Sequence, residues 1–269
     1  MPEGHTLHRL ASRLNRTMSG NVVTSTSPQG RFTAGAGLVD GLPFGRSEAW
    51  GKHLLVRVAD SAEMVHVHLG LYGKFTFVGG HDHPVVGQVR WRLQHEGWTA
   101  DLRGPTACEL LDPVGVDALK ARLGPDPLRK DADPDRAWQR MCRSRAPMAT
   151  LLMDQRVLAG VGNVYRAELL FRHHVDPDLP GRELDETTWL SMWDDLAVLM
   201  RHGVRTGRMD TVRPEDAQGP AARGRRRGGG EVYVYRRADL PCLVCGTTVL
   251  ARVLGGRNLF WCPSCQPSR

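Results

Sequence analysis

The sequence predicts an α+β protein with a β-rich N-terminal part, a helical middle and a metal-binding hairpin at the C-terminus. Residues 20–112 alternate apolar and polar side chains with a period of two, which is typical of antiparallel strands in a sandwich or barrel. From about residue 115 the apolar period becomes helical. Two Cys-x2-Cys pairs follow near the end of the chain. We therefore expect three domains, at 1–114, 115–232 and 233–269.

Gly and Pro residues mark the turns that divide these parts into helices and strands. The expected strands lie at 52–58, 64–69, 74–78 and 89–93. The expected helices lie near 115–123, 135–143, 147–154, 163–174 and 185–203. A further helix is expected at the N-terminus, because one face collects the apolar residues Leu7, Leu10, Ala11, Leu14 and Met18.

The chain begins with Met1-Pro2-Glu3-Gly4 directly in front of that helix. If Met1 is removed, Pro2 becomes a free secondary amine, and an α-amino group has a pKa of roughly 8, so much of it is nucleophilic near neutral pH. A secondary amine that condenses with an aldehyde gives only a charged iminium, which is an electron sink. Glu3 beside it is a candidate general acid and base. The same residues are also good helix-start chemistry, with Pro at the first position and an acid in the first turn.

The C-terminal cysteines have the spacing of a four-thiolate zinc site. Sixteen residues separate the pair Cys242 and Cys245 from the pair Cys262 and Cys265, which is long enough for a β-hairpin. Two disulfides are the alternative, but we find no signal peptide or transmembrane run in the sequence, so we expect one structural zinc ion and a cytoplasmic, nucleoid-associated protein. The hairpin tip carries Arg257, which is either solvated or a nucleic-acid contact.

The charge of the chain is basic and unevenly distributed. The formal net charge is +7 and the pI is about 9.4. Residues 201–237 hold ten arginines against four acidic residues, which accounts for nearly all of the excess. Arginine forks onto phosphate oxygens. We therefore interpret the Gly/Pro/Arg-rich segment 218–230 as a loop that faces a polyanion, although such a stretch could also be a solvated tail.

Three further patterns have both a functional and a structural interpretation. Asn163 follows Gly-x-Gly at a helix start, where its amide and the first N–H groups can face a phosphate, although an Asn-capped helix hairpin explains the same residues. Leu71 and Tyr72 lie on a Gly-flanked turn and are either an exposed wedge or core residues. His66 and His68 share a strand face, but without a third ligand a hydrogen-bonding role is favoured over a metal pair.

Taken together, these segments resemble the formamidopyrimidine-DNA glycosylase and endonuclease VIII family over nearly the whole chain. The match runs from the Pro-Glu start to a ribbon ending Arg-x4-Cys-Pro-x-Cys-Gln. The resemblance implies a β-sandwich lobe, a helix-two-turn-helix lobe and a zinc ribbon. It also implies a bifunctional DNA glycosylase/AP lyase that forms a Schiff base and cleaves by β,δ-elimination. In that reaction Pro2 resembles the nucleophile, Glu3 the acid that assists base loss, and Lys52 a strand lysine that contacts the backbone and supports catalysis.

The resemblance also implies a set of DNA contacts. They are the wedge residues Leu71 and Tyr72, an arginine resembling their partner, Arg103, and the phosphate clamps Asn163 and Arg257. The implied partner is damaged duplex DNA, with single-stranded or bubble DNA as an extension, bound by a monomer away from any membrane.

The branch of the family is indicated by the residues around the wedge. Leu-Tyr-Gly is similar to endonuclease VIII, whereas the purine-specific branch usually has Met-Ser-Gly, and the segment 101–105 lacks that branch's Arg-Phe. Both departures favour oxidised pyrimidines, although Gly70 stands where some endonuclease VIII proteins carry Gln. The alternatives are an 8-oxoguanine/formamidopyrimidine glycosylase, a member with weak strand cleavage, and a noncatalytic zinc-ribbon DNA-binding protein. Whether Met1 is removed distinguishes the noncatalytic protein from the enzymes. With Met1 attached, the Pro2 nitrogen is an amide and cannot act as a nucleophile.

Overall fold

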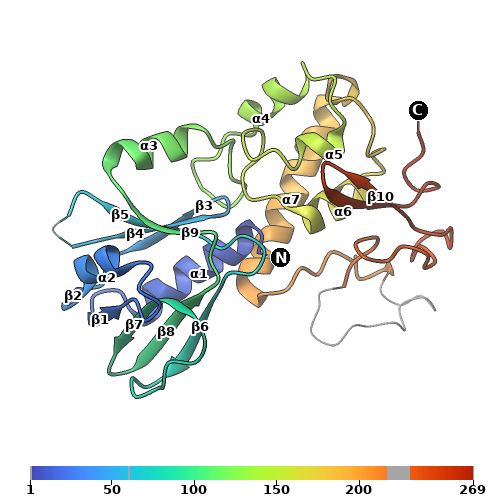
Figure 1. The fold of residues 1–269 in the computed structure, drawn as a ribbon. Coiled ribbons are helices and arrows are strands. Elements are labelled where there is room, and N and C mark those ends of the chain that lie inside the picture. The colour runs from blue at the N-terminus through green and yellow to red at the C-terminus, as the bar shows by residue number, and fades with distance from the viewer. Residues whose placement is uncertain (1, 60, 217–230, 269) are drawn as a thin grey trace. The chain divides into compact units, whose positions relative to one another are not determined.

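The computed structural model describes residues 2–59, 61–216 and 231–268. The chain divides into two compact units, with the boundary in the sequence between residues 122 and 123. The first unit contains α1 (Gly4–Thr17), β1 (Val22–Thr26), α2 (Thr33–Val39), β2 (Leu42–Pro43), β3 (Ser47–Trp50), β4 (His53–Arg57), β5 (Met64–His68), β6 (Lys74–Gly79), β7 (Val89–His95), β8 (Trp98–Arg103), β9 (Ala107–Leu111) and α3 (Pro113–Ala121) (Figure 1). The second contains α4 (Pro134–Met141), α5 (Met148–Leu151), α6 (Asn163–Arg172), the 3-10 turn η1 (Gly181–Glu183), α7 (Glu186–Thr206), β10 (Leu250–Leu254) and β11 (Arg257–Trp261).

The first unit is a sandwich of two antiparallel sheets. One sheet has the strand order β2-β1-β7-β8-β6 and the other β3-β4-β5-β9. Figure 1 shows α1 between the two layers, and its buried face, with Leu7 and Leu14 at 0% exposure, shares one core with residues of both sheets such as Leu54 and Trp91. The α+β class is confirmed, and the choice between sandwich and barrel is settled in favour of the sandwich.

The start of α1 differs from the helix-start interpretation. The helix begins at Gly4, so Pro2 lies outside it, and Glu3 occupies the N-cap position without a side-chain capping bond. No acidic residue lies in the first turn. Pro2 and Glu3 therefore do not act as the helix-starting residues that a Pro-Glu pair usually supplies.

The expected elements are present, and the structure adds strands β1, β2, β3, β8 and β9 and the turn η1, which the sequence analysis did not place individually. Two helices also differ from the expectation. Helix α2 was not expected, because its sequence TAGAGLV contains two glycines and no strong helical period. It forms because Ala36 and Val39 are buried in the core of the sandwich. Helix α5 ends at Leu151 rather than near 154, and the Asp154 carboxylate then accepts from the backbone N–H of Arg156 at 2.9 Å, a local bond that competes with helix.

The zinc ribbon is built into the helical unit. Its strands β10 and β11 are joined by Gly255 and Gly256, which both have positive φ, as a two-residue hairpin of the primed type requires. Phe260 of the ribbon shares a core with Ala167 and Phe171 of α6. The buried Gln266 side chain donates to Val175 O at 2.9 Å. Loss of the ribbon would therefore expose part of α6.

The helices of the described chain do not include a membrane span, since none combines sufficient length with sufficient apolarity. The domain boundaries expected at 114/115 and 232/233 stay a prediction.

Candidate active site and nucleic-acid interface

The N-terminal candidates lie at the entrance to α1. Glu3 is fully buried, and its backbone carbonyl accepts the first turn bond from Thr6 N at 2.8 Å, while its side chain does not cap the helix. Pro2 is half-buried. His5 is also buried, and burial followed by the charge of Arg9 lowers its pKa to about 4, so it is a neutral imidazole near neutral pH. The carboxyl group of Glu3, next to Pro2, is thus enclosed by protein and does not cap the helix.

Lys52 lies in a tight turn rather than on a strand, which corrects the sequence prediction. Trp50 of β3 pairs with His53 of β4, so Gly51 and Lys52 form a two-residue hairpin loop. Gly51 has φ 56°, as glycine at the first central position of a type II′ turn provides. The turn holds Lys52, which is half-buried, at the end of the four-stranded sheet.

The turn between β5 and β6 exposes the two expected wedge residues. Leu71 is 53% exposed and Tyr72 is 87% exposed, which rules out the interpretation of both as core residues. The flanking glycines are needed for this turn. A Cβ on Gly70 would lie 1.9 Å from Thr106 Oγ1, and one on Gly73 would lie 2.2 Å from the Leu69 carbonyl oxygen. Two apolar side chains are therefore held in solvent by a turn of fixed shape, as insertion into a base stack requires.

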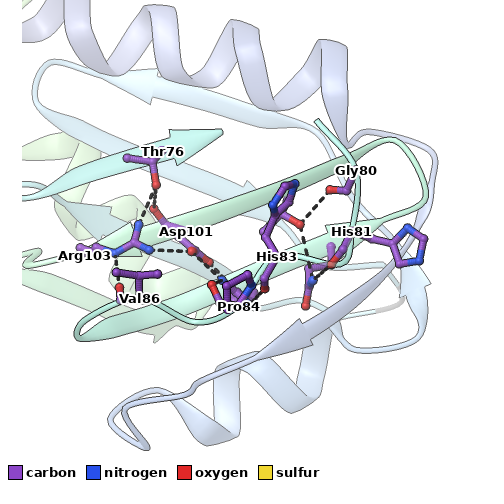
Figure 2. A network of polar contacts seen from close by, with 11 residues as sticks. Thr76, Gly80, His81, His83, Pro84, Val86, Asp101 and Arg103 are labelled. Atoms are coloured by element: carbon purple, nitrogen blue, oxygen red, sulfur yellow. Dashed lines mark hydrogen bonds and ion pairs between the residues drawn. The ribbon is translucent and has the colours of Figure 1, made fainter. Parts of the chain in front are cut away.

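Arg103 is held by its own sheet. Its Nη2 donates to Asp101 Oδ2 at 2.7 Å, its Nη1 to Thr76 Oγ1 at 2.6 Å, and its Nε to the Val86 carbonyl at 3.0 Å. Figure 2 shows this fork, which braces the segment between β6 and β7. The guanidinium, which the sequence analysis assigned to DNA, has three protein partners, and its role as a wedge partner stays a prediction.

In the second unit, Asn163 is hydrogen-bonded to Asn258, the residue that follows Arg257 on the hairpin. Asn163 is the first residue of α6, with Gly162 rather than Asn163 at the N-cap. Its Nδ2 donates to Asn258 O at 2.9 Å, and Arg166 donates to both Asn163 Oδ1 and Asn258 O. The buried amide thus fixes the hairpin tip on which the exposed Arg257 is carried. Direct contact of Asn163 or Arg257 with phosphate stays a prediction.

The turn in front of α6 is held by Gln155. Its Oε1 accepts from Gly160 N at 3.0 Å, and its Nε2 donates to Val161 O at 2.9 Å. Gly160 has φ 92°, a conformation that favours glycine. These bonds give the Gly-x-Gly turn one defined shape at the N-terminus of the helix.

The four C-terminal cysteines form the expected metal site. The sulfur atoms of Cys242, Cys245, Cys262 and Cys265 all lie within 4.8 Å of one another. Two separations are 3.9 Å and 3.5 Å, close to the ~3.8 Å between thiolates on a tetrahedral zinc with Zn–S bonds of ~2.3 Å. The residues fit a structural zinc ion, which would join the two turns of the ribbon. Among the described residues no other group of three metal-ligating side chains converges in this way.

Two features of the structure were missed by sequence analysis. The first is a contact of His53 with His66, on strands whose pairing the sequence does not specify. The second is Glu168 of α6, which is fully buried and accepts from the backbone N–H groups of Tyr233, Val234 and Tyr235 and from the Thr211 hydroxyl. These partners lie on either side of the Arg/Gly-rich segment 218–230 within loop 207–231, and the whole of that segment lies outside the described residues. The sequence carries no signal for the partners of Glu168, which is one of several polar residues of α6.

The fold and the site define a class: a protein with a β-sandwich unit and a helical unit that carries a four-cysteine zinc ribbon. Residues 1–108 match the family model described as "Formamidopyrimidine-DNA glycosylase N-terminal domain", residues 123–214 "Formamidopyrimidine-DNA glycosylase H2TH domain", and residues 239–267 "Zinc finger found in FPG and IleRS".

Similar proteins agree with this match over the full length. Endonuclease 8 1 of Mycobacterium tuberculosis is 50% identical, covering 99% of this chain and 100% of that protein. A protein of Mycolicibacterium smegmatis named "DNA-(apurinic or apyrimidinic site) lyase Nei2" is 33% identical, covering 99% of each. A Lactococcus lactis FPG mutant crystallised with Fapy-dG-containing DNA has the same fold, with a TM-score of 0.78 at 20% identity over 99% of this chain and 100% of that chain. The chain belongs to the formamidopyrimidine-DNA glycosylase and endonuclease VIII family.

Proposed function

We propose that this protein is a bifunctional DNA glycosylase and AP lyase, with Pro2 as the nucleophile once Met1 is removed. The observation that carries the proposal is the placement of Pro2 ahead of α1 beside the buried Glu3, whose side chain does not cap the helix. The AP lyase name of the Mycolicibacterium relative supports the second activity.

In the proposed reaction the Pro2 nitrogen forms a bond to the sugar C1′ as the glycosidic bond breaks, and the base leaves with the electron pair and takes up the proton that the nitrogen loses. Glu3 then gives a proton to the ring oxygen O4′, the C1′–O4′ bond breaks with its electron pair on that oxygen, and the nitrogen lone pair forms the C1′=N iminium. The resulting iminium withdraws electrons, so that loss of a C2′ proton expels the 3′ phosphate, and a second elimination releases the 5′ phosphate. The half-buried Lys52 would contact the backbone next to the lesion. Zinc takes no part in these steps and supplies structure to the ribbon.

The proposal is tested by trapping the iminium. Borohydride should link the protein lacking Met1 covalently to DNA with an abasic site, and Pro2→Gly should trap far less while it melts at the same temperature, because Pro2 precedes the helix and its removal breaks no helical bond. Lys52→Ala is the comparison variant, since it removes a primary amine that the proposal does not use as nucleophile, and it should keep more trapping than Pro2→Gly even though Lys52 supports catalysis. Trapping that survives in Pro2→Gly and disappears in Lys52→Ala would transfer the nucleophile to the lysine.

The proposed substrates are oxidised pyrimidines in damaged DNA. The Leu-Tyr-Gly sequence of the exposed turn and the absence of Arg-Phe from segment 101–105 support this choice, because both resemble the endonuclease VIII branch. The high identity to Endonuclease 8 1 also supports it. Single-stranded or bubble DNA is a further proposed substrate, because the absence of an opposite strand lowers the cost of unstacking the damaged base.

The substrate choice is tested by single-turnover rates on duplexes that differ only in the lesion. Thymine glycol, dihydrouracil or hydroxylated cytosine should be excised faster than 8-oxoguanine opposite cytosine. A pocket rejects the wrong base strongly only where buried polar groups would be left unpaired, so the ranking measures the pocket itself. A clear preference for 8-oxoguanine would favour the purine-specific alternative.

A further inference from the structure

Three histidines gather at the end of the four-stranded sheet from which the Lys52 turn and the wedge turn both begin. His53 and His68 are paired residues of β4 and β5. Lys52 directly precedes His53, and Leu71 and Tyr72 lie on the turn that follows His68. The pair is therefore the last rung of this ladder before both turns.

Hydrogen bonds connect this rung to a carboxylate on the next strand. His53 Nδ1 lies 2.9 Å from His66 Nε2, and His66 Nδ1 lies 2.9 Å from Glu109 Oε1 of β9. His66 is 5% exposed, whereas the Glu109 side chain is 54% exposed. The His53 ring also stacks on His66 and lies 4.9 Å, between ring centroids, from His68. A chain of side chains thus runs from solvent at Glu109 through His66 to His53.

The geometry of these hydrogen bonds determines the tautomers of His66 and His53. A carboxylate only accepts hydrogen bonds, so His66 donates from Nδ1 and its Nε2 must accept. His53 therefore donates from Nδ1, and its Nε2 carries the lone pair. In free neutral histidine the proton prefers Nε2, so two adjacent rings protonated at Nδ1 are a distinctive arrangement.

The charges around the cluster leave these imidazoles neutral. Burial, followed by the neighbouring imidazoles of His66 and His68, lowers the pKa of His53 to about 3. Burial also lowers the pKa of His66, although the hydrogen bond that His66 donates to Glu109 opposes the effect. The other charged groups that act on the cluster are Arg122, after α3, and Lys52. The tautomer argument therefore applies near neutral pH.

We propose that Glu109, His66 and His53 are positioning residues, whose hydrogen-bonded chain orients the end of the sheet that carries Lys52 and the wedge turn. None of the three needs to touch DNA. The inference rests on the role proposed above for Lys52, but the chain itself is testable without activity.

The first experiment reads the tautomers by 15N NMR of the imidazoles in the full-length protein. His53 and His66 should both be protonated at Nδ1 in the wild type. Glu109→Ala removes the acceptor, so His66 should move its proton to Nε2 and His53 should change tautomer as well, two links away from the substitution. Glu96→Ala, which removes an equally exposed carboxylate from the β7–β8 turn, should change neither ring. An unchanged His53 in Glu109→Ala would overturn the chain.

The second experiment measures single-turnover cleavage of DNA with a preformed abasic site. Glu109→Ala should be about tenfold slower than wild type or Glu96→Ala, at unchanged DNA affinity and melting temperature, because a small misplacement of a catalytic group costs rate. His66→Gln places an acceptor near the Nε2 position and should keep more activity than His66→Asn, whose amide mimics only Nδ1. Equal rates in wild type and Glu109→Ala would overturn the positioning role.

Lys52→Ala distinguishes the proposed role of Lys52 from the existence of the hydrogen-bonded chain of Glu109, His66 and His53. A strong loss of cleavage in this variant, with normal tautomers, supports both the lysine and the chain. Full cleavage in Lys52→Ala would overturn the role of Lys52 and with it the catalytic purpose of the chain, while the NMR result would still decide whether the chain exists.

Discussion

At the scale of single residues, Glu3 offers the sharpest prediction. Its side chain is buried and does not cap α1, so Glu3→Gln should preserve the fold while removing proton transfer. General acid catalysis contributes about 10²–10⁴-fold, so base excision should fall by that factor. Cleavage of a preformed abasic site should fall much less, because the base has already left. Single-turnover rates on the two substrates measure the difference, and equal losses would contradict this division of labour.

The residues that could be identified from the sequence are those with local signals. The four cysteines and the Gly-flanked Leu71-Tyr72 turn are defined by spacing within a short segment, and the structure brings the sulfurs together and exposes the turn. The surroundings of Arg103 and His53 could not be predicted. Their partners Thr76 and His66 come from other strands, and a sequence without the strand register does not say which residues face each other.

At the scale of elements, the pairing of α6 with α7 predicts a pH-dependent stability. Asp195 of α7 accepts from Arg172 Nε at 2.7 Å and Nη2 at 2.6 Å, and its Oδ2 lies 3.1 Å from His173 Nε2. Burial alone would raise the pKa of Asp195, but the hydrogen bonds from His173 and Arg172 lower it well below its usual range. The ionised carboxylate is therefore the form that holds the two helices together.

Asp195→Asn should destabilise the helical unit by about 3 kcal/mol at pH 7, because it leaves a buried guanidinium without its counter-charge. The pKa in the folded state is lower than the unfolded value of about 3.9, so the contribution is complete above that value and is lost as the pH falls toward the folded pKa. Urea unfolding followed by circular dichroism should show a constant gap between wild type and variant from pH 7 to 5, and a narrower gap below about pH 4. The exposed neighbour Asp194→Asn is the control and should change stability by less than about 0.5 kcal/mol.

The elements themselves were predictable where their periodicity was strong. The long helix expected at 185–203 is α7, which begins after an Asp185 cap that accepts from Thr188 N at 2.8 Å and ends at Gly207 with φ 78°. Helix α2 was missed because its glycines give no local signal, and tertiary burial decides it. The end of α5 was placed too late because a side-chain bond to Asp154 competes with the helix.

At the scale of the whole molecule, the chemistry and the grip on DNA are assigned to different units. The proposed catalytic residues Pro2, Glu3 and Lys52 belong to the first unit, whose core is separate from that of the helices. The proposed phosphate contacts Asn163 and Arg257 belong to the second. Damage to the second unit should therefore weaken binding while the sandwich remains folded.

Removal of zinc tests this separation. Because the ribbon shares a core with α6, a strong chelator or Cys262→Ser should lower the melting temperature of the helical unit and weaken DNA binding, and should leave the transition of the sandwich unit unchanged in calorimetry. Arg257→Ala is the matched control on the same hairpin. It should keep the metal and both transitions, and reduce the magnitude of the salt slope of DNA binding by about one unit for one lost phosphate contact. A metal-free protein that binds DNA normally, or a chelator that lowers both transitions equally, would contradict the assignment of grip and chemistry to separate units.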